Sequence, residues 1–283
     1  PAVRTARRHI AERLARGATG GIEDEARVPR LVLFGPPHLQ IAGRPVPASA
    51  WRAQRAFHML VFLALHPRGA AKEELLEYFW PGRQLAAGRR NFHPTLSYIR
   101  GVLPRSREPA ILREGEYYRL NPAYTLACDA WEMDRALEEA RAARDSGTRR
   151  RALERAATLA AAPFLEGVYS PWAEDLQSRT RDRIEKLHLE LGAECAKAGD
   201  HEVALGSFRR AAELDEFREA TRLGMIEAMV ALGNRRAAIA EYDKLKGLLR
   251  AELGVDPLPE TERAVQQLLA AGQSAAHGVA ATV

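Results

Sequence analysis

Hydrophobic residues between positions 89 and 103 recur at the spacing of a helix that turns one face to a core. They stand at i, i+4, i+7 and i+11, as Phe92, Leu96, Ile99 and Leu103. This spacing predicts an amphipathic helix over residues 89–103. At about 100° per residue, a different set of side chains covers its outward face and one flank. These are Arg90, Ser97 and Gly101 on the outward face and Arg89, His93 and Arg100 on the flank.

The outer surface of this predicted helix is cationic and small, and it has no carboxylate. A helix that lies in a DNA groove needs cations for the phosphates and donors for the base edges, and acidic groups would be repelled by the DNA backbone. A solvated helix of no such function has the same pattern. The neighbouring elements therefore decide between the two interpretations.

A small sheet and two helices are predicted ahead of the basic helix. Residues 31–35 form a short apolar run and residues 39–41 alternate, which predicts short antiparallel strands. Residues 51–66 have helical spacing and end at a Pro and a Gly. Residues 72–80 have the spacing of a second, short helix, and residues 82–88 are predicted to be a loop.

A β-hairpin is predicted behind the basic helix. Residues 111–113 and 117–120 flank Glu114-Gly115-Glu116, and Gly at the turn is typical of hairpins. The order of strands, helix, helix, loop, basic helix and hairpin predicts a winged helix-turn-helix, whose later helix enters the major groove. The hairpin would be the wing, with Arg113 and the nearby Arg119 close to phosphates or a minor groove.

Residues 129–272 have almost wholly helical patterns and contain a repeat of 34 residues. This offset relates Gly199 to Gly233, Leu189 to Leu223, Ala204 to Ala238, and Phe208 to Tyr242. Small residues with an aromatic at this period are typical of tetratricopeptide repeats. Gly and Ala let two helices approach, and the aromatic fills the gap to the next pair. Because fewer than three repeats rarely stand alone, residues 131–161 and 164–188 are expected to supply the remaining helices.

The two halves of the chain differ in charge. Residues 30–130 carry 14 Lys and Arg against 7 Asp and Glu, whereas residues 131–270 carry 22 against 26. The net charge of the whole chain is only +5. A basic first half indicates a polyanionic partner for that half.

Other classes of function have little support in the sequence. No run of about 18 apolar residues occurs. Cys128 and Cys195 lack metal-ligand spacing, and no phosphate-cradling loop or Ser/His/Asp set is present. We therefore expect no enzyme activity, no cofactor, no metal, no disulfide and no membrane partner, in a cytoplasmic protein. Because the sequence begins with Pro1 and no secretory segment follows, we also expect a processed product or an excised piece.

Ordered motifs in both halves identify a family resemblance. The first half has Val61-Phe62-Leu63-Ala64-Leu65-His66-Pro67, Glu74-Leu75, Phe79-Trp80-Pro81 and Asn91-Phe92-His93. The second half has Phe164-Leu165-Glu166-Gly167, Trp172, Ala198-Gly199-Asp200 and Glu252-Leu253-Gly254-Val255-Asp256-Pro257. Over about residues 30–270, the chain resembles the antibiotic regulatory protein (SARP) activators. The resemblance implies an OmpR-like winged helix followed by a bacterial transcriptional activator domain.

The expected fold is mostly α. A winged helix-turn-helix (α+β) is expected at 30–128 and an all-α tetratricopeptide-like domain at 129–271, with a tail or linker at 1–29 and a flexible tail at 272–283. The resemblance implies an activator that binds repeated sites in double-stranded promoter DNA and recruits RNA polymerase, with the helical domain aiding homodimerisation.

Six residues are predicted to contact DNA. Arg89, Arg90 and Arg100 are expected to neutralise phosphates or read guanine, His93 and Ser97 to make groove contacts, and Arg113 to touch the backbone from the wing. For His93, an exposed side chain without a ligand is an equally good interpretation. Arg149-Arg150-Arg151 is expected to begin a solvated helix rather than to add a second DNA contact.

Pro94 and Gly101 weaken the predicted reading helix. Either the helix begins near Asn91, which would put Pro94 in the first turn, or it is kinked. The same two residues favour an alternative function, a protein-interaction module in which both halves dock protein partners. A third interpretation is the C-terminal output region of a larger ATP-dependent regulator.

Overall fold

The computed structural model describes residues 28–280, which form two compact units. Unit 1 comprises the described residues up to Trp131 together with Leu165–Leu176. Unit 2 comprises Glu132–Phe164 and the described residues from Gln177 onward. The predictions made for residues 1–27, and for the last three positions of the predicted C-terminal tail, lie outside the described residues.

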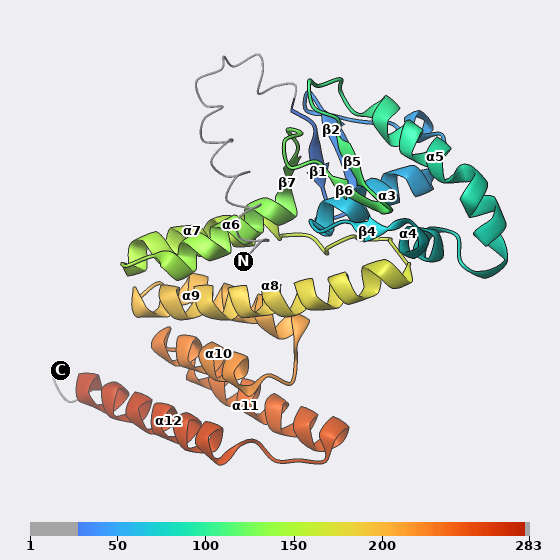
Figure 1. Cartoon of the computed structure of the whole chain (residues 1–283). Coiled ribbons are helices and arrows are strands. Elements are labelled where there is room, and N and C mark those ends of the chain that lie inside the picture. The colour runs from blue at the N-terminus through green and yellow to red at the C-terminus, as the bar shows by residue number, and fades with distance from the viewer. Residues whose placement is uncertain (1–27, 281–283) are drawn as a thin grey trace. The chain divides into compact units, whose positions relative to one another are not determined.

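Unit 1 contains a four-stranded sheet built from short strands (Figure 1). Its strands, in the order β3-β2-β1-β7, are β1 (Arg30–Val32), β2 (His38–Ile41), β3 (Arg44–Pro45) and β7 (Ala127–Cys128). β1, β2 and β3 pair antiparallel, as the alternating pattern predicts, whereas β7 pairs parallel with β1. A strand of two residues is too short to show alternation, so β7 is not evident from the sequence.

The helix-turn-helix and wing follow in the predicted order. The elements are a 3-10 turn η2 (Ala48–Trp51), α3 (Gln54–Leu65), β4 (Ala70–Ala71), α4 (Lys72–Phe79), a 3-10 turn η3 (Gly82–Gln84), α5 (Leu85–Val102), β5 (Ile111–Glu114) and β6 (Tyr117–Leu120). β5 and β6 form the predicted hairpin, and β4 pairs with β6 to give a second sheet in the order β4-β6-β5. Gly115, with φ of 63°, lies in the hairpin turn.

Two predicted boundaries are wrong. The first helix begins at Gln54 rather than at residue 51. Arg52 has a left-handed backbone with φ of 54°, which ends the 3-10 turn that contains Trp51 before α3 begins. α5 begins at Leu85, so most of the predicted loop at 82–88 is helical. Gly88 is a helical residue that packs on an aromatic ring: a Cβ there would lie 2.7 Å from the Cβ of Trp80.

Aromatic rings form the core of unit 1 and fix α5 to its neighbours. Phe92 of α5 is fully buried and meets Tyr118 of β6 edge-on, with ring centroids 5.0 Å apart. The Phe92 ring also lies 6.4 Å from that of Trp80, which follows α4. Since edge-to-face pairs add about 0.5–1.5 kcal/mol to the burial of their area, these contacts hold the helix against both the wing and α4.

A segment from the second half of the chain completes unit 1. The amide of Leu165 donates to the carbonyl of Leu33 over 2.8 Å, and the amide of Glu166 donates to the carbonyl of Gly35 over 3.1 Å. Farther along this segment, Trp172 is 5% exposed, and its ring lies edge-on to Phe62 of α3 with centroids 5.8 Å apart. Unit 1 is therefore discontinuous in sequence.

Unit 2 consists of helices. Their bounds are α6 (Asp129–Ala142, which begins in unit 1), α7 (Ser146–Leu159), α8 (Pro171–Lys197, whose first residues through Leu176 belong to unit 1), α9 (His201–Leu214), α10 (Glu219–Ala231), α11 (Arg235–Leu248), a π-helical turn (Leu249–Leu253) and α12 (Pro259–Ala280). Gly199 and Gly233, which define the 34-residue offset, both have positive φ, 81° and 76°, in the turns after α8 and α10.

The expected tight packing of the repeat is present around Phe208 of α9. A Cβ at Gly192 of α8 would lie 2.6 Å from the Phe208 ring, and a Cβ at Gly224 of α10 would lie 2.7 Å from it. Thus a ring fills the space between two backbones, and small residues on both sides allow this approach. Tyr242, the next residue at this offset, differs because its hydroxyl donates to Glu262 of α12 over 3.3 Å.

Candidate nucleic-acid interface

α5 buries the predicted face and exposes the predicted cations. Its inward residues Phe92, Leu96, Ile99 and Leu103 are between 0 and 4% exposed. Arg89, Arg90, His93, Ser97 and Arg100 are all exposed. The periodicity therefore predicts the orientation of the helix correctly, and the structure brings these five candidates together on one element.

The exposed surface of α5 lacks compensating acid. Between Glu77 and Glu108 the sequence has no Asp or Glu. Arg89, Arg90 and Arg100 form no ion pair with any residue between 28 and 280. Unpaired guanidinium groups on one helix produce a positive potential that attracts phosphates and other anions.

Pro94 lies in the interior of α5. The hypothesis that the helix begins near Asn91 is therefore wrong, since nine helical residues precede the proline. A proline cannot donate to the carbonyl four residues earlier, and its ring crowds that carbonyl. In the following turn the Thr95 hydroxyl donates to the carbonyl of Asn91 over 2.8 Å, which supplies an additional hydrogen bond beside the interruption.

The wing carries as many carboxylates as cations. Arg113 forms an ion pair with Glu116 at 2.8 Å, and its Nε also donates to the carbonyl of Gly115. Arg119 forms an ion pair with Glu114 at 2.5 Å, and this hydrogen bond holds the pKa of Glu114 below its ordinary value. Exposed pairs of this kind contribute at most about 1 kcal/mol, so a phosphate can compete for Arg113.

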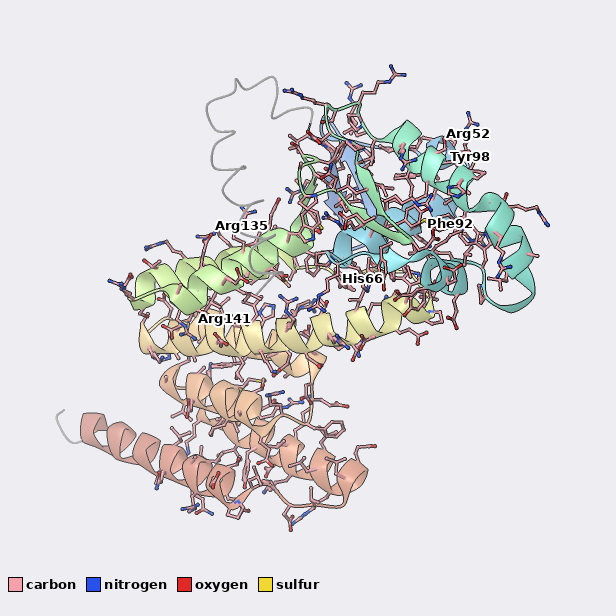
Figure 2. All side chains as sticks on the ribbon, viewed as in Figure 1. Arg52, His66, Phe92, Tyr98, Arg135 and Arg141 are labelled. Atoms are coloured by element: carbon pink, nitrogen blue, oxygen red, sulfur yellow. The ribbon has the colours of Figure 1, made fainter. Side chains whose placement is uncertain are left out.

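Two further cations lie beside α5 and are not evident from the sequence. Arg52 lies with its guanidinium 5.6 Å from the centre of the Tyr98 ring (Figure 2). Arg55 lies over the Trp80 ring at 5.0 Å and donates to Gln84 over 3.2 Å. The helical spacing places Arg55 among inward residues, and no sequence pattern relates Arg52 to α5, because the contact depends on the backbone turn at Arg52.

Two arginines of the run in unit 2, Arg149 and Arg150, are held in ion pairs. Arg149 forms ion pairs with Glu190 at 2.8 Å and with Glu194 at 3.6 Å, both on α8. Arg150 pairs with Glu154 at 2.8 Å and also with Asp200. These contacts hold α7 against α8 and the turn before α9, and they leave Arg149 and Arg150 less available to an outside anion than the arginines of α5.

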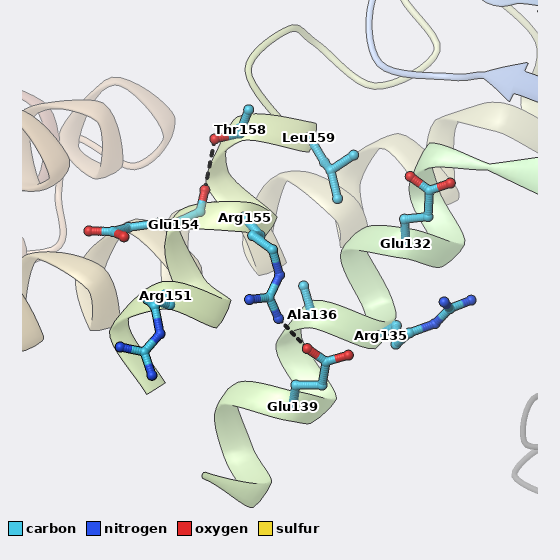
Figure 3. A pocket seen from close by; sticks show the side chains of 9 residues that line it. All are labelled: Glu132, Arg135, Ala136, Glu139, Arg151, Glu154, Arg155, Thr158 and Leu159. Atoms are coloured by element: carbon cyan, nitrogen blue, oxygen red, sulfur yellow. Dashed lines mark hydrogen bonds and ion pairs between the residues drawn. The ribbon is translucent and has the colours of Figure 1, made fainter. Parts of the chain in front are cut away.

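A groove in unit 2 runs between α6 and α7 (Figure 3). Its charged lining is balanced, with Arg135, Arg151 and Arg155 against Glu132, Glu139 and Glu154. Arg155 bridges the two helices by an ion pair with Glu139. Because the charges compensate one another, the groove has no net preference for an anion or a cation.

Within residues 28–280 no group of His, Cys, Asp or Glu is arranged to hold a metal ion. Cys128 and Cys195 are both buried and are not joined by a disulfide. Over the same range, no helix has the length and apolarity needed to cross a bilayer. The charged surface of α5 is therefore the strongest candidate site in the described part of the chain.

Comparison with known sequences decides the family. The sequence profile of the bacterial transcriptional activator domain matches residues 128–269, half of the chain. The chain belongs to this family. The matched range includes Leu165–Leu176, the segment that packs in unit 1. The family domain therefore supplies residues that complete the core of unit 1.

Relatives of this family member are regulators. The chain is 29% identical over 268 residues to the regulatory protein AfsR of Streptomyces coelicolor, covering 92% of this chain and 26% of that protein. It is 28% identical over 249 residues to AfsR of Streptomyces griseus, covering 81% of this chain and 24% of that protein. The chain thus spans about a quarter of the length of these relatives.

A solved structure confirms the fold class. EmbR of Mycobacterium tuberculosis, in complex with a low-affinity phosphopeptide, superposes with a TM-score of 0.71 at 21% identity and covers 90% of this chain and 69% of that one. The prediction of a mostly helical protein, with a mixed winged-helix region followed by an all-helical activator domain, is correct. The chain therefore contains a bacterial transcriptional activator domain and has the fold class of EmbR.

Proposed function

We propose that unit 1 binds double-stranded promoter DNA with α5 in the major groove. Arg89, Arg90 and Arg100 contact phosphates or guanine edges, and His93 and Ser97 contact the groove. Arg113 contacts the backbone from the wing, after exchanging Glu116 for a phosphate.

The observation that carries this proposal is the uncompensated charge of α5. Three exposed arginines stand on one helix, in a stretch of sequence without a carboxylate, and they have no ion-pair partner among the described residues. Phosphate contacts provide most of the affinity of such proteins for DNA, and base-edge contacts provide the sequence preference.

The helical unit is proposed to serve dimerisation and the recruitment of RNA polymerase. Its support is the family membership and the stacked, tightly packed helix pairs, which offer a stiff surface for a protein partner. A monomeric mass at micromolar concentration, both alone and with DNA, would remove the dimer from this proposal.

The experiment is DNA binding across a salt series, with random and genomic fragments as ligands. The wild-type chain should enrich a few repeated sites and show a steep fall of affinity with salt. The double variant R89A/R100A removes two proposed phosphate contacts, so the slope of log Kobs against log[salt] should become shallower by about 2. Binding to all sequences should weaken alike if both residues contact only phosphates.

A matched control removes the same charge elsewhere. Arg141 and Arg144 are exposed at the end of α6 and beyond it, and neither has an ion-pair partner among the described residues (Arg141 is labelled in Figure 2). The variant R141A/R144A should keep the wild-type slope. If both double variants change the slope equally, the effect is one of net charge, and the assignment of α5 to the groove is wrong.

A protein-interaction module is the second candidate. It is favoured by the wing, whose two arginines are paired with Glu114 and Glu116 and so present little net charge. It is also favoured by Pro94 within α5. Weak DNA binding without enrichment of any sequence, at low salt, would make this function the better one.

A further inference from the structure

A helix in the major groove has a phosphate backbone along each of its two flanks. On α5 the predicted cations Arg89 and Arg100 share one flank with His93, since these residues follow one another at helical spacing. Tyr98 lies on the opposite flank, with Arg90 and Ser97 between the two. α5 itself therefore supplies cations for only one of the two phosphate rows.

Arg52 brings a cation to the second flank. It follows the 3-10 turn Ala48–Trp51, is exposed, and places its guanidinium 5.6 Å from the centre of the Tyr98 ring (Figure 2). A guanidinium above an aromatic face is attracted by the ring and keeps its N–H groups free at the edge. No ion pair with a residue in the described range occupies the Arg52 side chain.

The backbone at Arg52 indicates that its side chain has a role. Arg52 has φ of 54° and ψ of −30°, a left-handed backbone conformation that residues other than glycine rarely adopt. Glycine adopts such angles without strain, so an arginine here is the less stable choice for the turn itself. The turn is held by its neighbours: Trp51 is buried, and its ring lies 5.1 Å from that of Phe57. Strained residues held in this way gather at functional sites.

We propose that Arg52 contacts a phosphate of the DNA strand along the Tyr98 flank of α5. Arg52 then contacts the phosphates on one side of the groove, and Arg89 and Arg100 contact those on the other side. The Tyr98 ring orients the Arg52 guanidinium. This inference rests on the proposed function of α5, and it adds a second row of contacts to it.

The test is the variant R52G, because glycine removes the cation and relieves the backbone strain at once. Its thermal midpoint should equal or exceed that of the wild type, whereas its salt slope should be shallower by about one unit and its affinity for DNA about fivefold lower at 0.15 M salt. A residue with only a structural role would change the thermal midpoint without changing the salt slope.

Two further variants make the result specific. R52K keeps the charge and should keep the salt slope. Arg44 is an exposed cation on β3 of the same unit, and R44A should leave both slope and affinity unchanged. A wild-type slope in R52G, or an equal loss in R44A, would overturn the proposal. Absence of DNA binding by the wild type would instead refute the proposed function of α5, so the two failures are distinguishable.

Discussion

Trp172 is the residue whose removal best tests the discontinuous architecture of unit 1. It belongs to a segment that arrives from the second half of the chain, yet its ring packs among side chains of the helix-turn-helix. The centroids of Phe62, Phe79 and His58 lie 5.8, 6.0 and 6.3 Å from it, and Trp172 itself is 5% exposed. The variant W172A would leave a void against α3 and α4.

The expected loss follows from the size of that void. Replacing a buried Phe or Trp by Ala costs about 3–5 kcal/mol, because both the transfer energy and the cavity count against the variant. The edge-on contact with Phe62 adds to the cost, whereas relaxation of the segment lowers it. We therefore expect unit 1 of W172A to lose about 3–4 kcal/mol of unfolding free energy.

Tryptophan fluorescence during urea unfolding measures the loss of stability of unit 1. All four tryptophans of the chain lie in unit 1, so Trp51, Trp80 and Trp131 still report its unfolding in W172A. Far-UV circular dichroism, dominated by the helices of both units, gives the second transition if the units unfold separately.

The control is a neighbour of Trp172 in the same segment. Tyr169 is 93% exposed, and Y169A should change the stability by less than about 0.5 kcal/mol. If W172A lost less than about 1 kcal/mol, or no more than Y169A, the segment would not be part of the cooperative core of unit 1 and the reasoning would be refuted.

Two predictions concern unit 2. G224A should destabilise unit 2 by about 1–3 kcal/mol, because the new methyl group meets the Phe208 ring. The control G206A, whose Cβ would meet nothing within 4 Å, should be neutral or stabilising. Equal urea midpoints for the two variants would contradict this packing. Burial, with a smaller effect of Arg210, lowers the pKa of His188 from 6.5 to about 4. The fold therefore favours the neutral form of His188. As the pH falls from 6.5 toward 4, His188 takes up its proton more readily in the unfolded chain, and the free energy of unfolding decreases. H188Q should flatten the dependence of the urea midpoint between pH 6.5 and 5, and an unchanged dependence would show that another group titrates there.

Hydrophobic periodicity predicts the orientation of α5 but not its start. Phe92, Leu96 and Ile99 recur on one face, and this pattern alone fixes which side chains are exposed. Gly88 suggests a loop by its propensity, whereas in the fold it is the residue that lets α5 approach Trp80. Tertiary packing here overrides local preference, so the boundary could not be found from the local sequence.

The contacts that tie distant segments together are even less visible in the sequence. The Leu165 amide donates to the carbonyl of Leu33, the residue after β1. The Asp129 carboxylate accepts from the amides of Leu33 and Phe34 at separations of 96 and 95 residues. Backbone donors occur at almost every residue, so such bonds leave no pattern of side chains. Sequence distance does not predict the pairing of the wing arginines either, because each pairs with the more distant glutamate: Arg113 with Glu116 and Arg119 with Glu114.

The dependence of unit 1 on Leu165–Leu176 sets an order of events during synthesis. Translation at about 5–20 residues per second needs roughly 2–9 s to pass from Trp131 to Leu176. During that time the nascent chain holds a winged helix without Trp172 in its core, while the first helices of the activator domain are already being made. A chain truncated in this interval would contain unit 1 without Trp172 and therefore with an incomplete core. Exchange of the two halves between related genes would likewise need the segment to travel with the winged helix, so a single crossover near residue 129 would separate residues that fold together.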